Sequence, residues 1–288
     1  MRSSPASRVP LALTLLGALF LLAACGPEPD TAAAFDHRHA LFDRVLRAYV
    51  EDGLVDYAAL KDDPATLDRY LDAVGAVTEA QYEGWTREQK LAYWINAYNA
   101  YTIKVVLQHY PIGRSIFADP LERYPASSIR QIPGVWKLRW WAAAGERYTL
   151  DHMEHVIMRQ EIGEPRIHFV LVCASLGCPK LESRSFDAEH LDQRLDQAAV
   201  NYIYRDDKVG IDREDGVMRL PRIFDWFAED FQPLAESAAF FEDRPAKIAG
   251  PLTWIYRYAN ERDRAFLQSG SYRVEYLPYD WGLNDQEP

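Results

Sequence analysis

Two cysteines stand five positions apart at the end of an apolar stretch, in the segment Arg166–Pro179 with the sequence RIHFVLVCASLGCP. They are Cys173 and Cys178, and the third cysteine of the chain is Cys25, near the N-terminus. Two thiols this close can pair as a structural disulfide in an oxidising compartment, or one of them can act as a nucleophile or redox thiol. This segment is therefore where we expect a reactive centre, with both interpretations open.

Cys173 is the better candidate for a nucleophile because it directly follows the apolar run, where a side chain can emerge into a cleft. A cysteine nucleophile needs a base and a group that orients the base. We predict that His155 is the base, since it lies in the element just before the cysteines and consecutive elements commonly pack together. The residues that could orient the imidazole are amides and carboxylates: Asn96, Asn99, Glu154 and Asp280. Ser175 and the backbone of Gly177 could donate hydrogen bonds to an oxyanion.

Two further histidines are secondary candidates. His168 lies in the apolar run before Cys173, and in a regular strand the alternation of side chains places these two on opposite faces. His152 and His155, together with Cys173 or Cys178, could form a metal site. However, a His-x-x-His pair lacks the i, i+4 spacing and the glutamate of the common zinc helix. We therefore predict no metal and no cofactor.

Three elements must position these side chains. The apolar run Ile167–Cys173 predicts a strand that is buried on both faces. Before it, Asp151–Gln160 has the pattern of a helix, which the Gly-Glu-Pro sequence at 163–165 ends. The third element is a long helix over Arg87–His109, opened by a capping box at Thr86. This helix is apolar almost all round, so we expect it at the centre of the fold.

Asn96 and Asn99 interrupt the apolar surface of the long helix. They are three positions apart and therefore share one face. A buried amide that lacks a hydrogen bond costs about 1–3 kcal/mol, so both must find partners. They can tie down neighbouring backbone, or they can line a site and orient a histidine or bind a substrate carbonyl. The sequence leaves both roles open.

The whole pattern predicts an α+β protein with a single domain over residues 36–288. We expect helices packed on a small mixed β-sheet around the long buried helix. The other helices of this domain are expected at 36–51, 67–74, 187–204, 222–228 and 247–260, and its short strands at 54–57, 208–211, 217–220 and 272–277. The strands expected at 208–211 and 217–220 flank Arg213–Gly216, which is a hairpin signal. After residue 35 there is no linker, repeat or low-complexity run that would indicate a second domain.

The N-terminal region has the features of a bacterial lipoprotein signal peptide. Two arginines precede an apolar run at 9–22 that is short for a membrane span, and a Leu-Ala-Ala-Cys sequence ends at Cys25. In such signals the cysteine is lipidated and becomes the N-terminus. We therefore expect 1–24 to be a lipoprotein signal peptide and 25–35 to be a lipidated tether. Gly26 is not an aspartate, so we expect an outer-membrane anchor facing the periplasm.

Charge narrows the choice of partners. The chain has 288 residues and a formal net charge of −11 at pH 7. Nucleic-acid binding needs a basic surface, and so does electrostatic adhesion to anionic lipid. We therefore expect no nucleic acid as a partner and a membrane contact made through the N-terminal lipid. A protein partner or a cell-envelope substrate is expected, but the composition does not identify it.

Five motifs occur in order along the chain. They are YWINAYNA at 93–100, YTLDHMEHVIMR at 148–159, IHFVLVCAS at 167–175, LPRIFDWF at 220–227 and LPYDW at 277–281. Together they resemble the family catalogued as domain of unknown function 547, over about Val55–Asn284. The resemblance implies a bacterial, often lipid-anchored, member of a family without an established activity. It implies no cofactor or substrate.

Two kinds of function remain open. In the first, the protein is a lipid-anchored cell-envelope protein with a binding or structural role, and the two cysteines form a structural disulfide. The alternative is a thiol-dependent hydrolase or acyltransferase, papain- or transglutaminase-like, that uses Cys173 and His155. Enzymes of those kinds usually carry the nucleophile at the start of the core helix, and the long helix at Arg87–His109 has no cysteine. We therefore favour the binding or structural role.

Overall fold

Helices supply most of the regular structure of this protein. The computed structural model describes residues 34–115, 124–205, 207–235 and 237–286. The predicted signal peptide, Cys25 and nearly all of the predicted tether lie outside the described residues. Residues Phe35–Pro288 form one compact unit. No helix within the described residues has both the length and the apolar character needed to cross a membrane.

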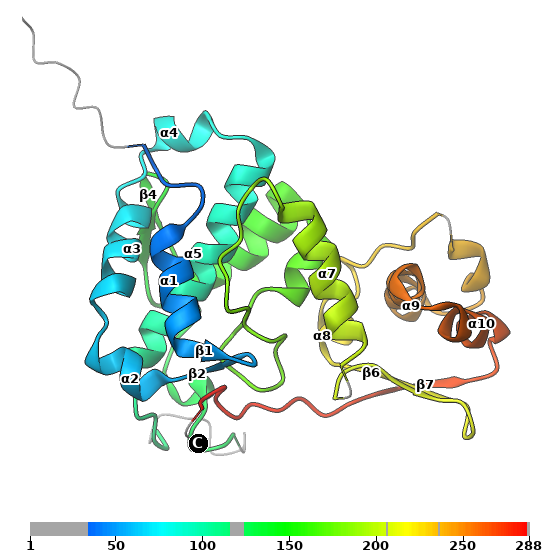
Figure 1. Ribbon diagram of the computed structural model, residues 1–288. Helices are drawn as coiled ribbons and strands as arrows, with labels where there is room; N and C mark the ends of the chain where they lie inside the picture. The colour runs from blue at the N-terminus through cyan, green and yellow to red at the C-terminus, as the bar shows by residue number, and fades with distance from the viewer. Residues whose placement is uncertain (1–33, 116–123, 206, 236, 287–288) are drawn as a thin grey trace, which may run out of the picture. The chain divides into compact units, whose positions relative to one another are not determined.

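Helix α5 (Arg87–Leu107) lies among other helices at the centre of the helical part of the fold (Figure 1). Every residue from Leu91 to Leu107 except Lys104 is buried. The Thr86 side chain accepts a hydrogen bond from the backbone of Gln89, and the Gln89 side chain accepts one from the backbone of Thr86. The predicted capping box and the predicted long buried helix are therefore confirmed.

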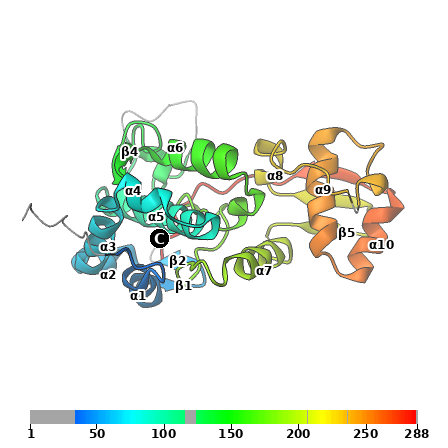
Figure 2. The same ribbon diagram turned by 90° about the horizontal axis from the view of Figure 1, so that it is seen from above.

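The first helices of the chain pack around α5. They are α1 (Ala40–Tyr49), α2 (Tyr57–Asp62), α3 (Ala65–Gly75) and α4 (Glu79–Glu83). Both α2 and α3 contact α5, and α1 packs on α3, as Figures 1 and 2 show from two sides. The ring of Phe42 on α1 stacks on Tyr70 of α3, with 5.0 Å between the ring centroids. The helices predicted at 36–51 and 67–74 are confirmed, with shifted ends.

The strands are short and form three small sheets. Two are antiparallel pairs: β1 (Val50–Glu51) with β2 (Leu54–Val55), and β3 (Trp141–Ala143) with β4 (Glu146–Tyr148). In the third sheet, the central strand pairs antiparallel with one neighbour and parallel with the other. Its strands, in the order of the sheet, are β5 (Gly210–Asp212), β6 (Val217–Leu220) and β7 (Arg273–Tyr276). The α+β class and the small mixed sheet are confirmed.

The α-helices that follow the cysteine loop lie in the second half of the chain, and two short 3₁₀ turns stand before and among them. They are α7 (Leu191–Ile203), α8 (Ile223–Trp226), α9 (Ala246–Tyr258) and α10 (Glu261–Ser269), with short 3₁₀ turns η1 (Ile129–Gln131) and η4 (Ala238–Phe240). Helix α9 contacts α7, α8 and α10. It lies with α10 close to the mixed sheet in both views (Figures 1 and 2).

The last segment of the chain returns from β7 to the first strands, as the red trace in Figure 1 shows. Asp285 forms a parallel bridge with Val55. Beside this bridge, the hydroxyl of Tyr57 donates a hydrogen bond to Asn284 Oδ1 at 2.9 Å. Leu283 forms an antiparallel bridge with Ser175. This return brings the LPYDW motif against the loop that carries the cysteines.

The segment that precedes Cys173 is not a strand, and the prediction of a strand at Ile167–Cys173 is wrong. Pro165–Phe169 forms a 3₁₀ turn, η3, and the residues that follow it pair with no strand. Their backbone groups bond to a side chain instead. Asn99 Nδ2 donates to Val170 O at 3.0 Å, and Val172 N–H donates to Asn99 Oδ1 at 2.9 Å. A buried amide on α5 thus satisfies groups that would otherwise need a neighbouring strand.

The helix predicted at Asp151–Gln160 exists, but most of it is a π-helix. A short α-helical turn, α6 (Leu150–His152), continues directly into η2 (Met153–Ile162), which has i→i+5 hydrogen bonding. The Thr149 side chain caps the start by accepting from the backbone of His152 at 3.1 Å. Gly163, in the left-handed conformation, ends the helix. Helix η2 contacts both α5 and η3, the turn that precedes the cysteine loop.

Candidate active site

A tight turn brings the two cysteines together. Ala174 has a φ of 59°, in the left-handed region that residues other than glycine rarely adopt. The backbone N–H of Cys178 donates to Ser175 O at 3.1 Å. The backbone N–H of Cys173 points at Cys178 Sγ and lies 3.0 Å from it. Both cysteines are free thiols in this structure, Cys178 buried and Cys173 partly exposed.

The C-terminal segment holds this turn in place. The N–H groups of Leu176 and Gly177 donate to the carbonyl oxygens of Gly282 and Asp280, both at 2.8 Å. Gly177 is required for this close approach, because a Cβ there would lie 2.7 Å from the ring of Tyr279. The position of Tyr279 relative to the cysteines is therefore fixed by the backbone.

A buried lysine supports the turn from the other side. Lys208 is 3% exposed, and its Nζ donates to Leu176 O at 3.2 Å and to Gly177 O at 2.9 Å. Its ammonium group also pairs with Asp207 at 3.2 Å. Burial lowers the pKa of Lys208. The lysine satisfies two carbonyl groups and places a positive charge behind the cysteines.

Cys173, Ser175, Cys178 and Tyr279 form a compact cluster of polar side chains. The Tyr279 hydroxyl lies 2.9 Å from Ser175 Oγ, 3.1 Å from Cys178 Sγ and 3.3 Å from Cys173 Sγ. Ser175 Oγ lies 3.3 Å from Cys178 Sγ and 3.4 Å from Cys173 Sγ. The cluster provides several hydrogen-bond donors for a negative charge on sulfur.

These contacts shift the pKa values of the two thiols in opposite directions. Burial opposes ionisation of Cys178, but hydrogen bonds from Cys173, Ser175 and Tyr279 outweigh it and lower the pKa of Cys178 to about 6. The hydrogen bond to Cys178, followed by burial, raises the pKa of Cys173 well above its ordinary value. Burial also raises the pKa of Tyr279, so its hydroxyl stays a donor. The contacts therefore favour a negative charge on Cys178 over one on Cys173.

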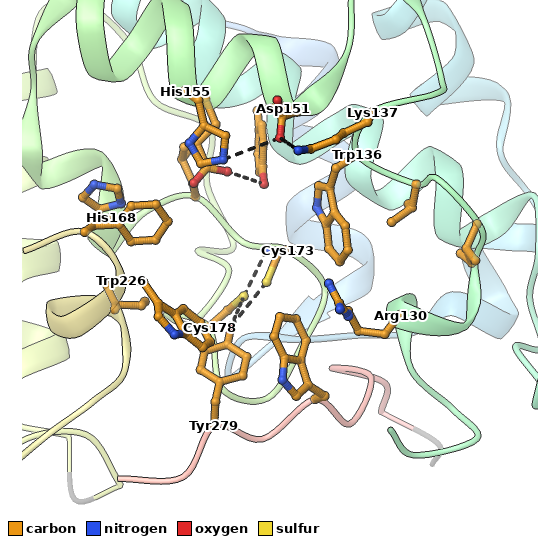
Figure 3. Close-up of a pocket in the computed structure, with 18 of the residues that line it drawn as sticks. Arg130, Trp136, Lys137, Asp151, His155, His168, Cys173, Cys178, Trp226 and Tyr279 are labelled. Atoms are coloured by element: carbon orange, nitrogen blue, oxygen red, sulfur yellow. Dashed lines mark hydrogen bonds and ion pairs between the residues drawn. The ribbon is translucent and has the colours of Figure 1, made fainter. Parts of the chain in front are cut away.

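Both thiols lie at the wall of a cavity of about 550 Å³ (Figure 3). Aromatic rings make up much of its lining: Tyr98, Trp136, Trp226, Phe227, Tyr279 and Trp281. Its charged and titratable lining residues are Arg130, Lys137, Asp151, Glu154, His155 and His168. The volume lies within the range of about 300–1,000 Å³ that is usual for sites of small molecules. The cavity is thus large enough for a small organic ligand beside the thiols.

His155 lines the same cavity as Cys173, but among the described residues no hydrogen bond joins them (Figure 3). Its Nδ1 accepts a hydrogen bond from Arg159 at 2.9 Å, and its Nε2 lies 3.7 Å from Asp151 Oδ1. The sequence predicts a thiol–imidazole contact, whereas the thiol of Cys173 contacts the cluster around Tyr279 instead.

A network of ion pairs holds Arg159 beside His155. Asp230 accepts from Arg159 Nε at 2.5 Å and from its NH2 group at 3.0 Å. The same carboxylate lies 2.6 Å from His168 Nε2. Burial raises the pKa of Asp230, but the hydrogen bonds from His168 and Arg159 outweigh it and lower the pKa to about 2. The rings of His168 and Phe227 stack, with 4.1 Å between their centroids.

His168 and Cys173 both line the cavity, so the expectation that they face opposite ways is wrong. That expectation assumed the alternation of a strand, and the segment is not a strand. Glu154 also lines the cavity, and its Oε2 accepts from the hydroxyl of Tyr98 at 2.8 Å. Neither Glu154 nor His168 forms a hydrogen bond with His155 among the described residues.

The two asparagines of α5 bond to backbone rather than to a histidine. Asn96 Nδ2 donates to Ala92 O at 2.8 Å and to Phe186 O at 2.7 Å, and its Oδ1 accepts from Phe186 N at 3.0 Å. Asn99 holds the segment before Cys173 in the same way. Both amides are therefore satisfied by the fold, and neither is among the residues that line the cavity.

Three other candidates have local roles. The Asp280 side chain accepts from Gly282 N at 2.8 Å, and its carbonyl accepts from the backbone of Gly177. Gly177 N–H is thus used within the fold and is not available to an oxyanion. The ring of His152 lies against Tyr148, with 5.3 Å between the centroids. Within the described residues, no group of three or more His, Cys, Asp or Glu side chains is placed to hold a metal ion.

The sequence does not predict several residues that contact the cysteines or fix His155. In the LPYDW motif the candidate predicted from the sequence is Asp280, whereas the structure places the neighbouring Tyr279 at the thiols. Arg159 ends one motif and Asp230 lies three positions after another, but neither is a candidate until the fold joins them. The recurring Trp-containing motifs are the available signal for the aromatic lining, since Trp226 and Trp281 belong to them.

Comparison with known proteins finds a match to one family model. Neither the curated proteins nor the solved structures contain a match to this chain. A family model matches one segment, residues 82–203, which includes α5, η2, η3 and the cysteine loop and ends at the last residue of α7. The two motifs after residue 203 lie outside it. Residues 82–203 match the family model described as "Protein of unknown function, DUF547", which supports the resemblance drawn from the motifs.

Proposed function

We propose that this protein is a lipid-anchored cell-envelope protein that binds a small acyl compound in its cavity and acts as a thiol-dependent hydrolase or acyltransferase. The observation that supports this most directly is the pair Cys173 and Cys178 at the cavity wall. Cys178 Sγ lies within 3.3 Å of the backbone N–H of Cys173 and of the hydroxyl oxygens of Ser175 and Tyr279. Structural thiols rarely need so many donors, whereas a thiolate does.

The pair supplies both the nucleophile and the base. Interacting groups of this kind titrate as a unit. Cys173 is the more exposed of the two and lines the cavity. When its proton moves to Cys178, the sulfur of Cys173 becomes the nucleophile. Cys178 then has the role of base that the sequence predicts for His155.

The aromatic lining supports an acyl compound with an apolar or aromatic body. Rings of Trp226, Tyr279 and Trp281 lie together, with centroid separations of 4.5 Å between Tyr279 and Trp281 and 4.8 Å between Trp226 and Tyr279. Such rings bury a large apolar area next to the thiols. Trp226 is 46% exposed, so a ligand would cover surface that is now in contact with solvent.

The formation of an acyl-enzyme tests this proposal. The protein would be incubated with phenyl phenylacetate and its intact mass measured over time. We expect one phenylacetyl group on Cys173, no adduct in Cys173→Ser, and formation slowed by about 10²-fold or more in Cys178→Ser, because a base is lost. Ser183→Ala, at an exposed position nearby, should behave as wild type. If wild type forms no adduct, the enzymatic role is excluded and the binding or structural role is favoured.

The cell-envelope address is supported by the apolar run at 9–22 and the Leu-Ala-Ala-Cys sequence that ends at Cys25. We expect the outer membrane, with the domain in the periplasm. Growth with labelled palmitate should label the protein, and Cys25→Ala should remove the label and shift the protein to the soluble fraction. Unchanged labelling of the variant would contradict lipidation at this cysteine.

A further inference from the structure

We propose that His155 is a fixed hydrogen-bond donor to the carbonyl oxygen of the substrate, and that the substrates are thioesters or oxygen esters and not amides. This inference rests on the proposed thiol-dependent acyl chemistry and deepens it. It assigns to His155 a role that differs from the base predicted from the sequence.

The contact with Arg159 decides which nitrogen of His155 carries the proton. Arg159 NH1 lies 2.9 Å from His155 Nδ1. A guanidinium only donates hydrogen bonds, so Nδ1 must be the acceptor and carries no proton. The ring proton is therefore on Nε2. Since Nε2 is 3.7 Å from Asp151 Oδ1, beyond hydrogen-bond distance, its N–H is not consumed by that carboxylate.

Arg159 is not free to turn away from His155. Its guanidinium donates to both carboxylate oxygens of Asp230 and to Glu229 at 2.9 Å. Its Cζ lies over the ring of Phe227, 4.8 Å from the centroid. Asp230 is fixed in turn by His168 at 2.6 Å. A bidentate pair of this kind has a defined geometry, so the donation to His155 Nδ1 is built into the fold.

Four backbone N–H groups of the cysteine loop, those of Cys173, Leu176, Gly177 and Cys178, are already bonded within the fold and are not available to an oxyanion. The acceptors are Cys178 Sγ for Cys173, Gly282 O for Leu176, Asp280 O for Gly177 and Ser175 O for Cys178. The negative charge that develops on a substrate carbonyl oxygen can draw on a donor from elsewhere in the cavity lining. His155 Nε2–H is such a donor, in the way that a neutral imidazole can polarise a carbonyl.

The reaction balances with the groups present and with water. The proton of Cys173 moves to Cys178, and Cys173 Sγ attacks the carbonyl carbon. The carbonyl oxygen becomes negative and accepts the hydrogen bond from His155 Nε2–H. The bond from carbon to the leaving sulfur or oxygen breaks, and the leaving group takes the proton from Cys178. Water, or an acceptor thiol or alcohol, then attacks the acyl group on Cys173, gives its proton to Cys178, and releases Cys173.

The same arrangement disfavours amides. The leaving nitrogen of an amide must be protonated before its bond to carbon breaks, and an imidazolium commonly supplies that proton. In this site the leaving group takes its proton from Cys178, which is buried in the cluster around Tyr279. Thiolate and aryloxide leaving groups depart without this help. The site is therefore suited to thioesters and esters.

The test compares three phenylacetyl compounds and two variants. The S-phenyl thioester, the O-phenyl ester and the anilide of phenylacetic acid would be assayed for release of thiophenol, phenol and aniline. His155→Gln keeps an N–H donor near the position of Nε2, and His155→Leu removes it. Alkylation of the thiols by iodoacetamide is measured in parallel, because that reaction develops no oxyanion and reports only on the thiol pair.

We expect wild type to turn over the thioester and the ester, with at least about 10²-fold less acceleration of the anilide over its uncatalysed rate. His155→Leu should lower kcat by about 10²- to 10³-fold, the usual effect of losing one oxyanion donor, and His155→Gln by less than about tenfold. Alkylation should stay within about twofold of wild type in both variants. If both variants lose acylation and alkylation together, His155 is a base and this inference is wrong. If the anilide is accelerated as much as the ester, the assignment of the substrate class is wrong. If wild type is acylated by none of the three, the proposed function fails first.

Discussion

Tyr279 and Cys178 are 101 positions apart in the chain, and the phenol oxygen of one lies 3.1 Å from the sulfur of the other. This contact exists because the C-terminal segment returns across the cysteine loop and is pinned there by backbone hydrogen bonds. It places a donor with a raised pKa beside a thiol with a lowered one. The acidity of the thiol pair therefore depends on the correct docking of the end of the chain.

Replacing Tyr279 by Phe should weaken the thiolate without unfolding the protein. A hydrogen bond to a charged group contributes about 1.5–3 kcal/mol, equivalent to one pKa unit or more. Since the pKa of Cys178 is lowered to about 6, Tyr279→Phe should slow iodoacetamide alkylation at pH 6 by about fivefold or more. Tyr276→Phe, on the neighbouring strand, is the matched control and should react as wild type. Equal rates for all three proteins would show that Tyr279 does not stabilise the thiolate.

Lys208→Met should destabilise the fold and also reduce the reactivity of the cysteines. The substitution leaves the carbonyl groups of Leu176 and Gly177 buried without their donor, which costs about 1–3 kcal/mol. It also removes the positive charge behind the loop, so the thiolate should be less favoured. Urea unfolding measures the first effect and alkylation at pH 6 the second. Lys180→Met, with a side chain that is 44% exposed, should change stability by less than about 0.5 kcal/mol. A Lys208 variant as stable as the Lys180 variant would contradict the supporting role.

Trp94→Ala should be among the costly substitutions in the core. Trp94 is 1% exposed on α5, and its Nε1 donates to the Tyr82 hydroxyl at 2.7 Å. Truncating such a side chain costs about 3–5 kcal/mol. Trp140→Ala, at a residue that is 54% exposed, should cost less than about 0.5 kcal/mol. Denaturant unfolding of both variants distinguishes the two sites, and a near-neutral Trp94→Ala would refute the central position of α5.

The buried side chain of His39 should make the folded protein less stable in acid. The pKa of this buried histidine is lowered from 6.5 to about 3, chiefly by burial. The unfolded state then binds the proton more tightly than the folded state, so stability should fall as pH decreases from 6.5 toward 3. The slope contributed is about 1.4 kcal/mol per pH unit at most.

His39→Asn removes this titration while suiting the backbone, because asparagine tolerates the left-handed conformation that His39 adopts with a φ of 51°. The loss of the hydrogen bond to Tyr70 shifts the stability of the variant equally at every pH. Unfolding free energies measured between pH 7 and pH 4 should therefore decline less steeply in the variant. Parallel curves would show that His39 does not titrate as its burial requires.

The sequence carries enough information for the main elements of the fold and not for the site. Local signals predict α5, because the Thr86 capping box and a continuous apolar surface are both visible within one segment. The wrong prediction of a strand at Ile167–Cys173 has a long-range cause. Asn99, more than 70 positions away from Val170 and Val172, satisfies their backbone groups, and no local pattern reveals this.

Long-range partners also decide the roles of the candidate residues. Cys173, His155, Glu154 and His168 are named from their types and positions, and they do line one cavity. Their chemical states depend on partners from other elements. Asp230 reaches Arg159 and His168 from 71 and 62 positions away, and Arg159 then fixes the tautomer of His155. A spacing of four between His155 and Arg159 suggests a contact but does not indicate which nitrogen is protonated.

The most direct test of this account is the pH dependence of iodoacetamide alkylation, with the modified residue identified by mass spectrometry. Because the pKa of Cys178 is lowered to about 6 and its thiolate can take the proton of Cys173, wild type should react with a midpoint near pH 6 and carry the label on the more exposed Cys173. In Cys178→Ser the midpoint should rise toward the ordinary thiol value of about 8.5. A wild-type midpoint near that ordinary value, unchanged by Cys178→Ser, would contradict the thiol pair on which the account depends.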